Sequence, residues 1–201
     1  MRSRWLPLFL LLFTASLLTA QATYKLNPRN PAEVAAAQRR AVGLYCRLDF
    51  DGGRFNEEGW QKIRPLMQDR QNPDFRVIEI VSRYHIAPPS EGPSSPYVNV
   101  TYTLMGRFDG NYGYSADTSL RQVMFRAEYK GGEVLIASVE PNVPRVSKRA
   151  AVEWLKRRLD SVQDPVEKGY IAKALAVLEP PTTPAGTPAA KTDAAAPGES
   201  K

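Results

Sequence analysis

Apolar positions follow a helical spacing at both ends of the chain and an alternating spacing in its middle. Near the N-terminus they recur every three or four residues, which predicts a helix with one buried stripe. The predicted stripe consists of Val34, Ala37, Ala41, Leu44 and Leu48. Cys46 lies away from the centre of this stripe.

Four polar residues mark predicted helix starts, namely Asn30, Asn56, Ser147 and Asp164. Asn30 and Asp164 are each followed by Pro and, three residues on, by Glu, which is a typical N-terminal signal. Asn56 precedes two glutamates that suit the positive end of a helix dipole. The sequence therefore predicts two N-terminal helices and a C-terminal helical pair.

Between residues 75 and 141 the apolar spacing becomes that of strands, in four runs: 75–86, 96–108, 122–130 and 133–141. Gly131-Gly132 between the last two runs predicts a tight hairpin. Strands follow helices in blocks and do not alternate with them, which indicates an α+β fold. We expect N-terminal helices packed on an antiparallel sheet of about four strands, plus C-terminal helices.

The first 22 residues have the features of a cleavable signal peptide, with Arg2 and Arg4, an apolar run and an Ala-x-Ala end. The apolar run, about 13 residues, is shorter than the ~20 that span a bilayer. We therefore expect a periplasmic or secreted protein without a transmembrane segment after cleavage. Residues 23–28 would be a short linker.

The rest of the chain divides by composition. We expect one domain at 29–178, with its core at 31–146 and its C-terminal helices at 147–178. Residues 179–201 are rich in Pro, Ala and Thr and carry no aromatic residue, which predicts a disordered tail.

Charge and cysteine content exclude several classes of function. Loss of the signal peptide lowers the net charge from +6 to +4, because that segment contains two arginines and no acidic residue. This small, dispersed excess does not indicate nucleic-acid binding. With one cysteine the chain forms no internal disulfide, so its stability must come from a packed core.

The segment LYCRLDFDGGRFNEEGW at residues 44–60 contains the only cysteine, two nearby aspartates and a Gly-Gly pair, and is a candidate for chemistry. It resembles a calcium loop, but counting from Asp49 the fifth and twelfth ligand positions hold Gly53 and Trp60, which offer no side-chain oxygen. Cys46 would need a base to act as a nucleophile, and the only histidine is His85. A helix connection explains the segment better, and we expect no metal and no cofactor.

The remaining candidates are polar groups within apolar strands and aromatic or basic residues on the surface. Tyr84, His85 and Tyr102 lie in predicted strands and could polarise a carbonyl or move a proton if they converged in a dry pocket. Four other residues form a candidate interaction surface: Tyr112 and Tyr114 in a Gly-rich loop, and Arg149 and Arg157 on a basic helix. Buried rings, ordinary loop composition and solvated charges are the alternative explanations.

A family resemblance supports this plan. The succession DFDGGRFNEEGWQKIRPL, VIEIVSRYHI, VNVTYTLMGRF and EVLIASVEPNVPRV resembles the nuclear transport factor 2-like superfamily, in particular its uncharacterised secreted bacterial members. The resemblance covers residues 31–146 and implies a curved antiparallel sheet wrapped around helices, with an interior that can hold a small ligand. It implies that Trp60, Tyr84 and Tyr102 line this cavity, between the first two helices and the sheet. It also implies a candidate homodimer. The family's enzymes use Asp or His bases with Tyr partners, but no Asp occupies a recognisable position here, so no catalytic residue is transferred.

Three functional hypotheses follow. The first is a non-catalytic extracytoplasmic domain that binds a small apolar ligand or an envelope protein. The second is a small-molecule isomerase, dehydratase or hydrolase that uses Tyr84, His85 and Tyr102. The third is a structural module that contacts the envelope through the basic helix at residues 148–159. Convergence of the three strand residues in a closed cavity would favour the second hypothesis.

Overall fold

The structure is a computed structural model that describes residues 27–72, 77–88, 94–110 and 112–180. The predicted signal peptide, the linker up to residue 26 and the predicted tail from residue 181 lie outside the described residues. The expectations for these segments stay predictions.

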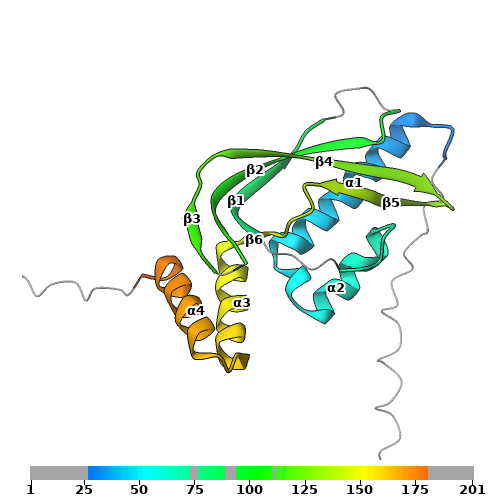
Figure 1. The fold of residues 1–201 in the computed structure, drawn as a ribbon. Coiled ribbons are helices and arrows are strands. Elements are labelled where there is room, and N and C mark those ends of the chain that lie inside the picture. The colour runs from blue at the N-terminus through cyan, green and yellow to red at the C-terminus, as the bar shows by residue number, and fades with distance from the viewer. Residues whose placement is uncertain (1–26, 73–76, 89–93, 111, 181–201) are drawn as a thin grey trace, which may run out of the picture.

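The described chain forms helices, then strands, then helices, in the order that the sequence predicts (Figure 1). The helices are α1 (Pro31–Phe50), the short turns η1 (Gly53–Phe55) and η2 (Arg64–Leu66), α2 (Glu57–Ile63), α3 (Lys148–Ser161) and α4 (Pro165–Leu178). The strands are β1 (Ile78–Ile86), β2 (Tyr97–Phe108), β3 (Tyr114–Ala116), β4 (Leu120–Lys130), β5 (Glu133–Glu140) and β6 (Arg145–Ser147).

All four predicted helix caps are confirmed. The side chains of Asn30, Asn56, Ser147 and Asp164 each accept a hydrogen bond from a backbone N–H in the first turn of their helix. The predicted hairpin is also confirmed, since Gly131 and Gly132 both have positive φ between β4 and β5.

The predicted α+β fold is confirmed, and the sheet contains two short strands that the sequence did not reveal. The strand order is β5-β4-β2-β1-β6, with β3 paired to the far end of β2. The four long strands pair antiparallel, whereas β6 runs parallel to β1, so the sheet is mixed. Irregular register between β1 and β2 near Val81 accompanies the bend of the sheet.

The bent sheet has one core against each helical pair (Figure 1). The first core lies between the sheet and the helices α1 and α2, and it includes Val42, Tyr45, Ile63, Tyr102 and Phe125. The second core lies between the bent end of the sheet and the helices α3 and α4, and it includes Ile80, Phe108, Val146, Leu155 and Ile171.

The predicted buried stripe of α1 is wrong. The helix buries Ala35, Gln38, Val42, Tyr45, Cys46 and Asp49. Leu44, which the prediction placed inside, is 37% exposed, and Cys46 is fully buried. The side of α1 that faces the sheet contains two polar residues, Gln38 and Asp49. Both can be buried because they form hydrogen bonds with distant segments of the chain.

Two helical glycines differ in the space around them. A methyl group on Gly59 in α2 would lie 2.5 Å from the Cα and carbonyl oxygen of Gly53. A methyl group on Gly169 in α4 would meet no atom within 4 Å. Only the first glycine is therefore required by packing.

We predict opposite effects for the two alanine substitutions. Gly169→Ala should stabilise the protein by about 0.5–1 kcal/mol, because alanine favours the helix. Gly59→Ala should destabilise it by about 1–3 kcal/mol, because the backbone of Gly53 must move away. Chemical denaturation of both variants measures the difference, and an equal stabilisation would contradict this packing.

Candidate functional site

The four residues predicted to line a pocket do not share one cavity in the described part of the structure. Trp60 lines a pocket of about 100 Å³ beside α1, together with Tyr45, Arg54, Met67, Asp69, Gln71 and Asn142. Tyr84 and His85 line a separate, open groove of about 440 Å³ on the other side of the sheet. Tyr102 lines neither, because it is buried in the first core.

Tyr102 and Cys46 contact each other inside the first core. The hydroxyl oxygen of Tyr102 lies 3.1 Å from Sγ of Cys46, and either atom can donate the hydrogen. Burial raises the pKa of the Cys46 thiol to about 12, although the bond to Tyr102 acts in the opposite direction. Cys46 is thus a protonated packing residue, and His85 is exposed and does not lie in this core.

None of the described helices packs on the central strands at the side of the sheet that faces away from α1, and we call this side the outer face (Figure 1). Strand register aligns its exposed side chains in rows, such as Arg83, Thr103 and Leu120, or His85, Thr101 and Gln122. The whole outer face consists of Arg83, His85, Tyr97, Asn99, Thr101, Thr103, Leu120, Gln122, Met124 and Arg126.

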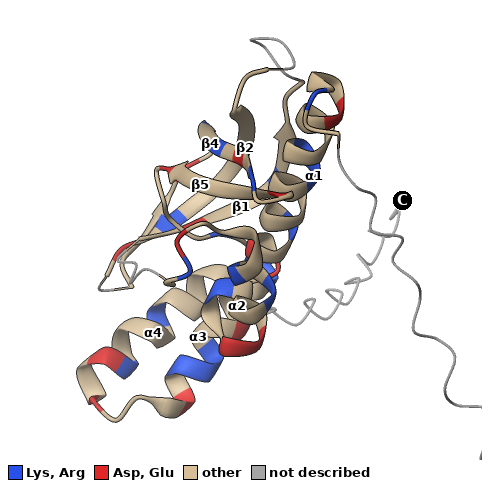
Figure 2. Ribbon diagram, turned by 90° about the vertical axis from the view of Figure 1, so that its right-hand side faces the viewer, with Lys and Arg blue, Asp and Glu red and all other residues tan. Residues whose placement is uncertain are grey.

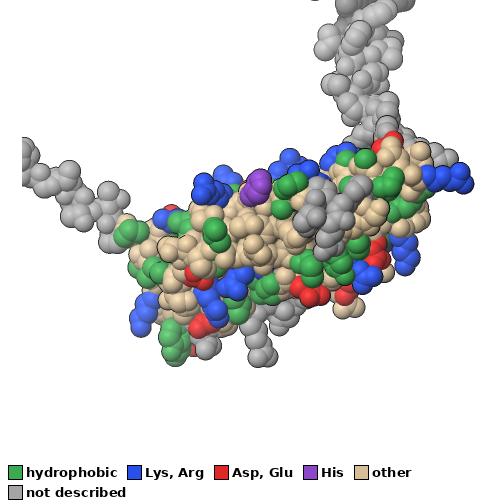
Figure 3. Space-filling model, turned by 90° about the horizontal axis from the view of Figure 1, so that it is seen from above, with side chains coloured by type: hydrophobic (Ala, Val, Ile, Leu, Met, Phe, Trp, Pro, Cys, Tyr) green, Lys and Arg blue, Asp and Glu red, His purple; other side chains and the backbone are tan. Residues whose placement is uncertain are grey.

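The outer face combines apolar and basic side chains. Leu120 is 67% exposed, Met124 41% and Tyr97 37%. Figure 3 shows this face with His85 in purple and basic and apolar side chains near it. The open groove between Arg83, His85 and Leu120 includes two threonine hydroxyls and no acidic side chain. This arrangement makes the outer face the candidate binding site.

The sequence offered a partial signal for this face. The alternation within the predicted strand at 96–108 distinguishes the two sides of β2, because its apolar residues Val98, Val100, Tyr102 and Leu104 all lie inside. The same alternation therefore also indicates which residues of β2 lie on the exposed side. The exposure of Leu120 was not indicated, because Leu120 precedes the predicted run at 122–130, whereas Met124 shares the exposed side of β4 with Gln122 and Arg126.

A second feature, absent from the sequence predictions, is a buried charge cluster formed by Asp49, Glu79 and Arg145. Nε of Arg145 lies 2.8 Å from Oε2 of Glu79, as an ion pair without the alignment of a hydrogen bond. The Arg145 guanidinium also donates to the carbonyls of Pro141 and Val143 and lies over the Tyr102 ring, 5.1 Å from its centre. Removal of one member of such a pair commonly costs about 3–5 kcal/mol.

Asp49 joins this cluster to helix α1. Its Oδ2 accepts a hydrogen bond of 3.0 Å from the backbone N–H of Arg145, while Oδ1 has no hydrogen-bond partner among the described residues. Burial raises the pKa of Asp49 from 3.8 to about 6, although Arg54 and Arg145 lower it in part. The carboxyl group therefore titrates close to neutral pH.

Tyr112 and Tyr114, predicted as contact residues, are engaged within the protein. The Tyr112 hydroxyl donates to Glu167 at 2.9 Å and accepts from Arg158 at 3.1 Å, which connects the β2–β3 loop to α3 and α4. The Tyr114 hydroxyl donates to the carbonyl of Met105 at 2.9 Å. Both rings pack against the second core.

Arg149 and Arg157 lie exposed on α3, where basic and acidic side chains are interspersed (Figure 2). Arg149 lies 4.0 Å from Glu153, and Lys156 lies 2.7 Å from Glu179. Acidic neighbours thus offset part of the positive charge that the sequence assigned to this helix.

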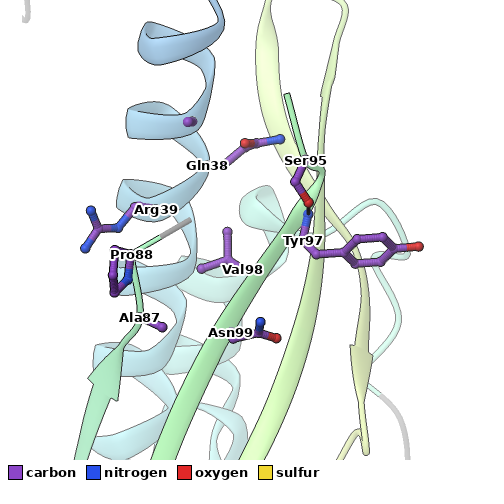
Figure 4. Close-up of a pocket in the computed structure, with 9 residues that line it drawn as sticks. Gln38, Arg39, Ala87, Pro88, Ser95, Tyr97, Val98 and Asn99 are labelled. Atoms are coloured by element: carbon purple, nitrogen blue, oxygen red, sulfur yellow. Dashed lines mark hydrogen bonds between the residues drawn. The ribbon is translucent and has the colours of Figure 1, made fainter. Parts of the chain in front are cut away.

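A third hollow is too small for an organic ligand. It lies between α1 and the neighbouring ends of β1 and β2, has a volume of about 10 Å³, and is lined by residues that include Gln38, Val98 and Asn99 (Figure 4). Such a volume corresponds to about one water molecule. Nε2 of Gln38 donates to the carbonyl of Ala127 at 2.7 Å, so this polar side chain serves the packing of α1 on the sheet.

Comparison with known proteins does not identify the chain, since no protein-family model, curated protein or solved structure matches it. Within the described ranges no helix is long and apolar enough to cross a membrane. In the same ranges no three His, Cys, Asp or Glu side chains are grouped so that they could hold a metal ion.

The raised pKa of Asp49 predicts a particular dependence of stability on pH. The folded protein binds this proton more tightly than the unfolded chain, so the stabilisation is complete below pH 3.8 and is lost as the pH rises through about 6. Relative to Asp49→Asn, the wild type should lose on the order of 2 kcal/mol of unfolding free energy between pH 4 and 7.

Denaturant titrations of both proteins at each pH measure this difference. Asp160→Asn, at an exposed position of α3, is the control and should keep the wild-type pH profile. A constant difference between Asp49→Asn and the wild type would show that Asp49 does not titrate in this range.

Proposed function

We propose that this protein is a non-catalytic, extracytoplasmic binding domain that holds a partner protein against the outer face of its sheet. The observation that carries the proposal is the mixed, exposed character of this face: Leu120 shares a cross-strand row with Arg83, and Met124 and Tyr97 are exposed further along the same face. Apolar patches with a polar rim are typical of protein interfaces. The signal-like N-terminus supports the proposed location outside the cytoplasm.

The filling of the first core favours a protein partner over a small apolar ligand. Large side chains such as Tyr45, Tyr102 and Phe125 occupy the space between α1 and the sheet. The Trp60 pocket, at about 100 Å³, is smaller than the roughly 300–1,000 Å³ of typical ligand sites. It also contains the charged residues Arg54 and Asp69, which do not suit an apolar ligand.

The catalytic alternative has less support. It requires Tyr84, His85 and Tyr102 to converge in a closed cavity, whereas His85 is exposed and Tyr102 is buried on the opposite side of the sheet. The Tyr84 and Tyr102 rings do contact each other, with centroids 5.8 Å apart. The carboxyl group of Asp49 acts on Tyr102 and raises its pKa, but Oδ2 of Asp49 already accepts a hydrogen bond from the backbone N–H of Arg145.

Membership of the nuclear transport factor 2-like superfamily is likewise a proposal. A helix that crosses the inner side of a bent sheet is compatible with it (Figure 1). The candidate homodimer would be formed by the same outer face and is one of the outcomes that the following experiment separates.

We predict that the outer face can be cross-linked to a partner in the native cell. A photoreactive amino acid at Gln122, on the outer face, should give one protein adduct, whereas the same amino acid at Gln61 on α2 should give none. The adduct at Gln122 should disappear in the variants Leu120→Lys and Arg83→Glu, because both alter exposed contacts without disturbing the core.

The mass of the adduct identifies the partner. A second copy of the chain would support the homodimer, and another protein would support the proposed function. Equal labelling at Gln122 and Gln61, or an adduct that both variants leave unchanged, would contradict a specific site on this face.

A further inference from the structure

The last part of β1 is an open edge of the sheet. β6 pairs with β1 only at Glu79, Ile80 and Val81. Beyond these residues, no described strand lies on that side of β1, although β2 continues to pair with its other side as far as Ile86. On this side of β1, residues 83–86 therefore pair with no described strand.

The main-chain groups of Tyr84 and Ile86 point out of this edge. The N–H of Ala87 donates to the carbonyl of Asn99 at 2.9 Å, which fixes the alternation of hydrogen bonds between β1 and β2. This alternation repeats every second residue. The main-chain groups of His85 and Arg83 therefore also face β2, whereas those of Tyr84 and Ile86 face away from it. No hydrogen bond from these two N–H groups, or to their carbonyls, is found within the described residues.

The surroundings of the edge are mainly basic. Arg83 and His85 project from the outer face, and Arg39 on α1 lies beside Ala87 and Pro88 at the end of the strand (Figure 4). Arg47 lies near the Tyr84 side chain, where Asp51 is the acidic neighbour. All four of these basic or titratable side chains are exposed: Arg39, Arg47, Arg83 and His85.

We propose that the open edge of β1 binds an extended acidic peptide segment of a partner protein, which adds to the sheet as a further strand. Its main chain would pair with the N–H and C=O groups of Tyr84 and Ile86, which is the usual source of affinity in strand addition. Acidic side chains on alternate residues would face Arg83 and His85 and thereby fix the register.

A second copy of the chain is a poorer occupant of this edge. Two β1 strands paired about a two-fold axis would bring Arg83 of one copy close to Arg83 of the other. Like charges opposite each other on paired strands are destabilising. An acidic strand from a different protein avoids this repulsion and is therefore the better occupant of the edge.

This inference rests on the proposed binding function, since it specifies the segment by which the partner is recognised. Failure of the proposed function and failure of this inference can be distinguished by experiment. Loss of cross-links at Gln122 in Leu120→Lys tests the outer face, whereas peptide binding tests the edge, which that substitution does not touch.

The test uses the mature protein and a blocked synthetic peptide of about seven residues, the usual strand length, that alternates Glu and Val. Amide hydrogen exchange followed by NMR should slow by about tenfold or more at Tyr84 and Ile86 when the peptide is bound. Exchange at Arg83 and His85 should not change, because their N–H groups already bond to β2.

Matched peptides and variants separate pairing from simple charge attraction. A peptide that alternates Lys and Val should not bind, and an acidic peptide N-methylated on alternate amides should bind about tenfold more weakly. Ile86→Pro removes an edge-facing N–H and should weaken binding, with Ile86→Val as the control for folding.

The proposal is overturned if the acidic peptide does not bind, or if N-methylation leaves its affinity unchanged. It is also overturned if Tyr84 and Ile86 become protected at high protein concentration without peptide, since a second copy would then occupy the edge. The N-methylated peptide keeps the test decisive even if Ile86→Pro does not fold.

Discussion

The ion pair between Arg145 and Glu79 lies where the two cores of the domain meet. Arg145 extends over the Tyr102 ring of the first core, and its neighbour Val146 belongs to the second. The backbone N–H of Arg145 also bonds to Asp49 at the end of α1. One short strand thereby connects the bent sheet, the helix that crosses it and the second core. Because charges in such a place are costly unless paired, the positions of β1, β6 and α1 depend on one another.

This arrangement leaves little room for a ligand inside the domain, which favours the proposed function at its surface. The space between α1 and the sheet, where a ligand-binding fold of this shape would hold its ligand, contains packed aromatic rings and the charge cluster. Arg83 and His85 are exposed both on the outer face and at the edge of β1. A single partner could therefore contact the face with its folded part and the edge with an extended segment.

Local signals in the sequence were sufficient for most of the fold. Helix caps, the Gly131-Gly132 turn and the alternation in β2 each depend on neighbouring residues, and all were predicted correctly. The buried side of α1 was not, because Gln38 and Asp49 become buried only through bonds to Ala127 and Arg145, about 90 residues away. Strands β3 and β6, with three residues each, are too short to show a period.

The candidate site was less accessible from the sequence. Tyr84, His85 and Tyr102 lie close together in the sheet, but the alternation of strands sends His85 outward and Tyr102 inward. Tyr112 and Tyr114 have the composition of an exposed loop, yet Arg158 and Glu167 on the C-terminal helices engage Tyr112. Such pairings between distant segments leave no periodic trace in a single sequence.

Native mass spectrometry of the mature protein, purified gently from its own cell envelope, tests most directly whether this domain acts through its surface. We expect the mass of the chain alone or of a complex with another protein chain, because the interior is filled by its own side chains. A retained molecule of a few hundred daltons, typical of a carried small ligand and lost on denaturation, would contradict that account.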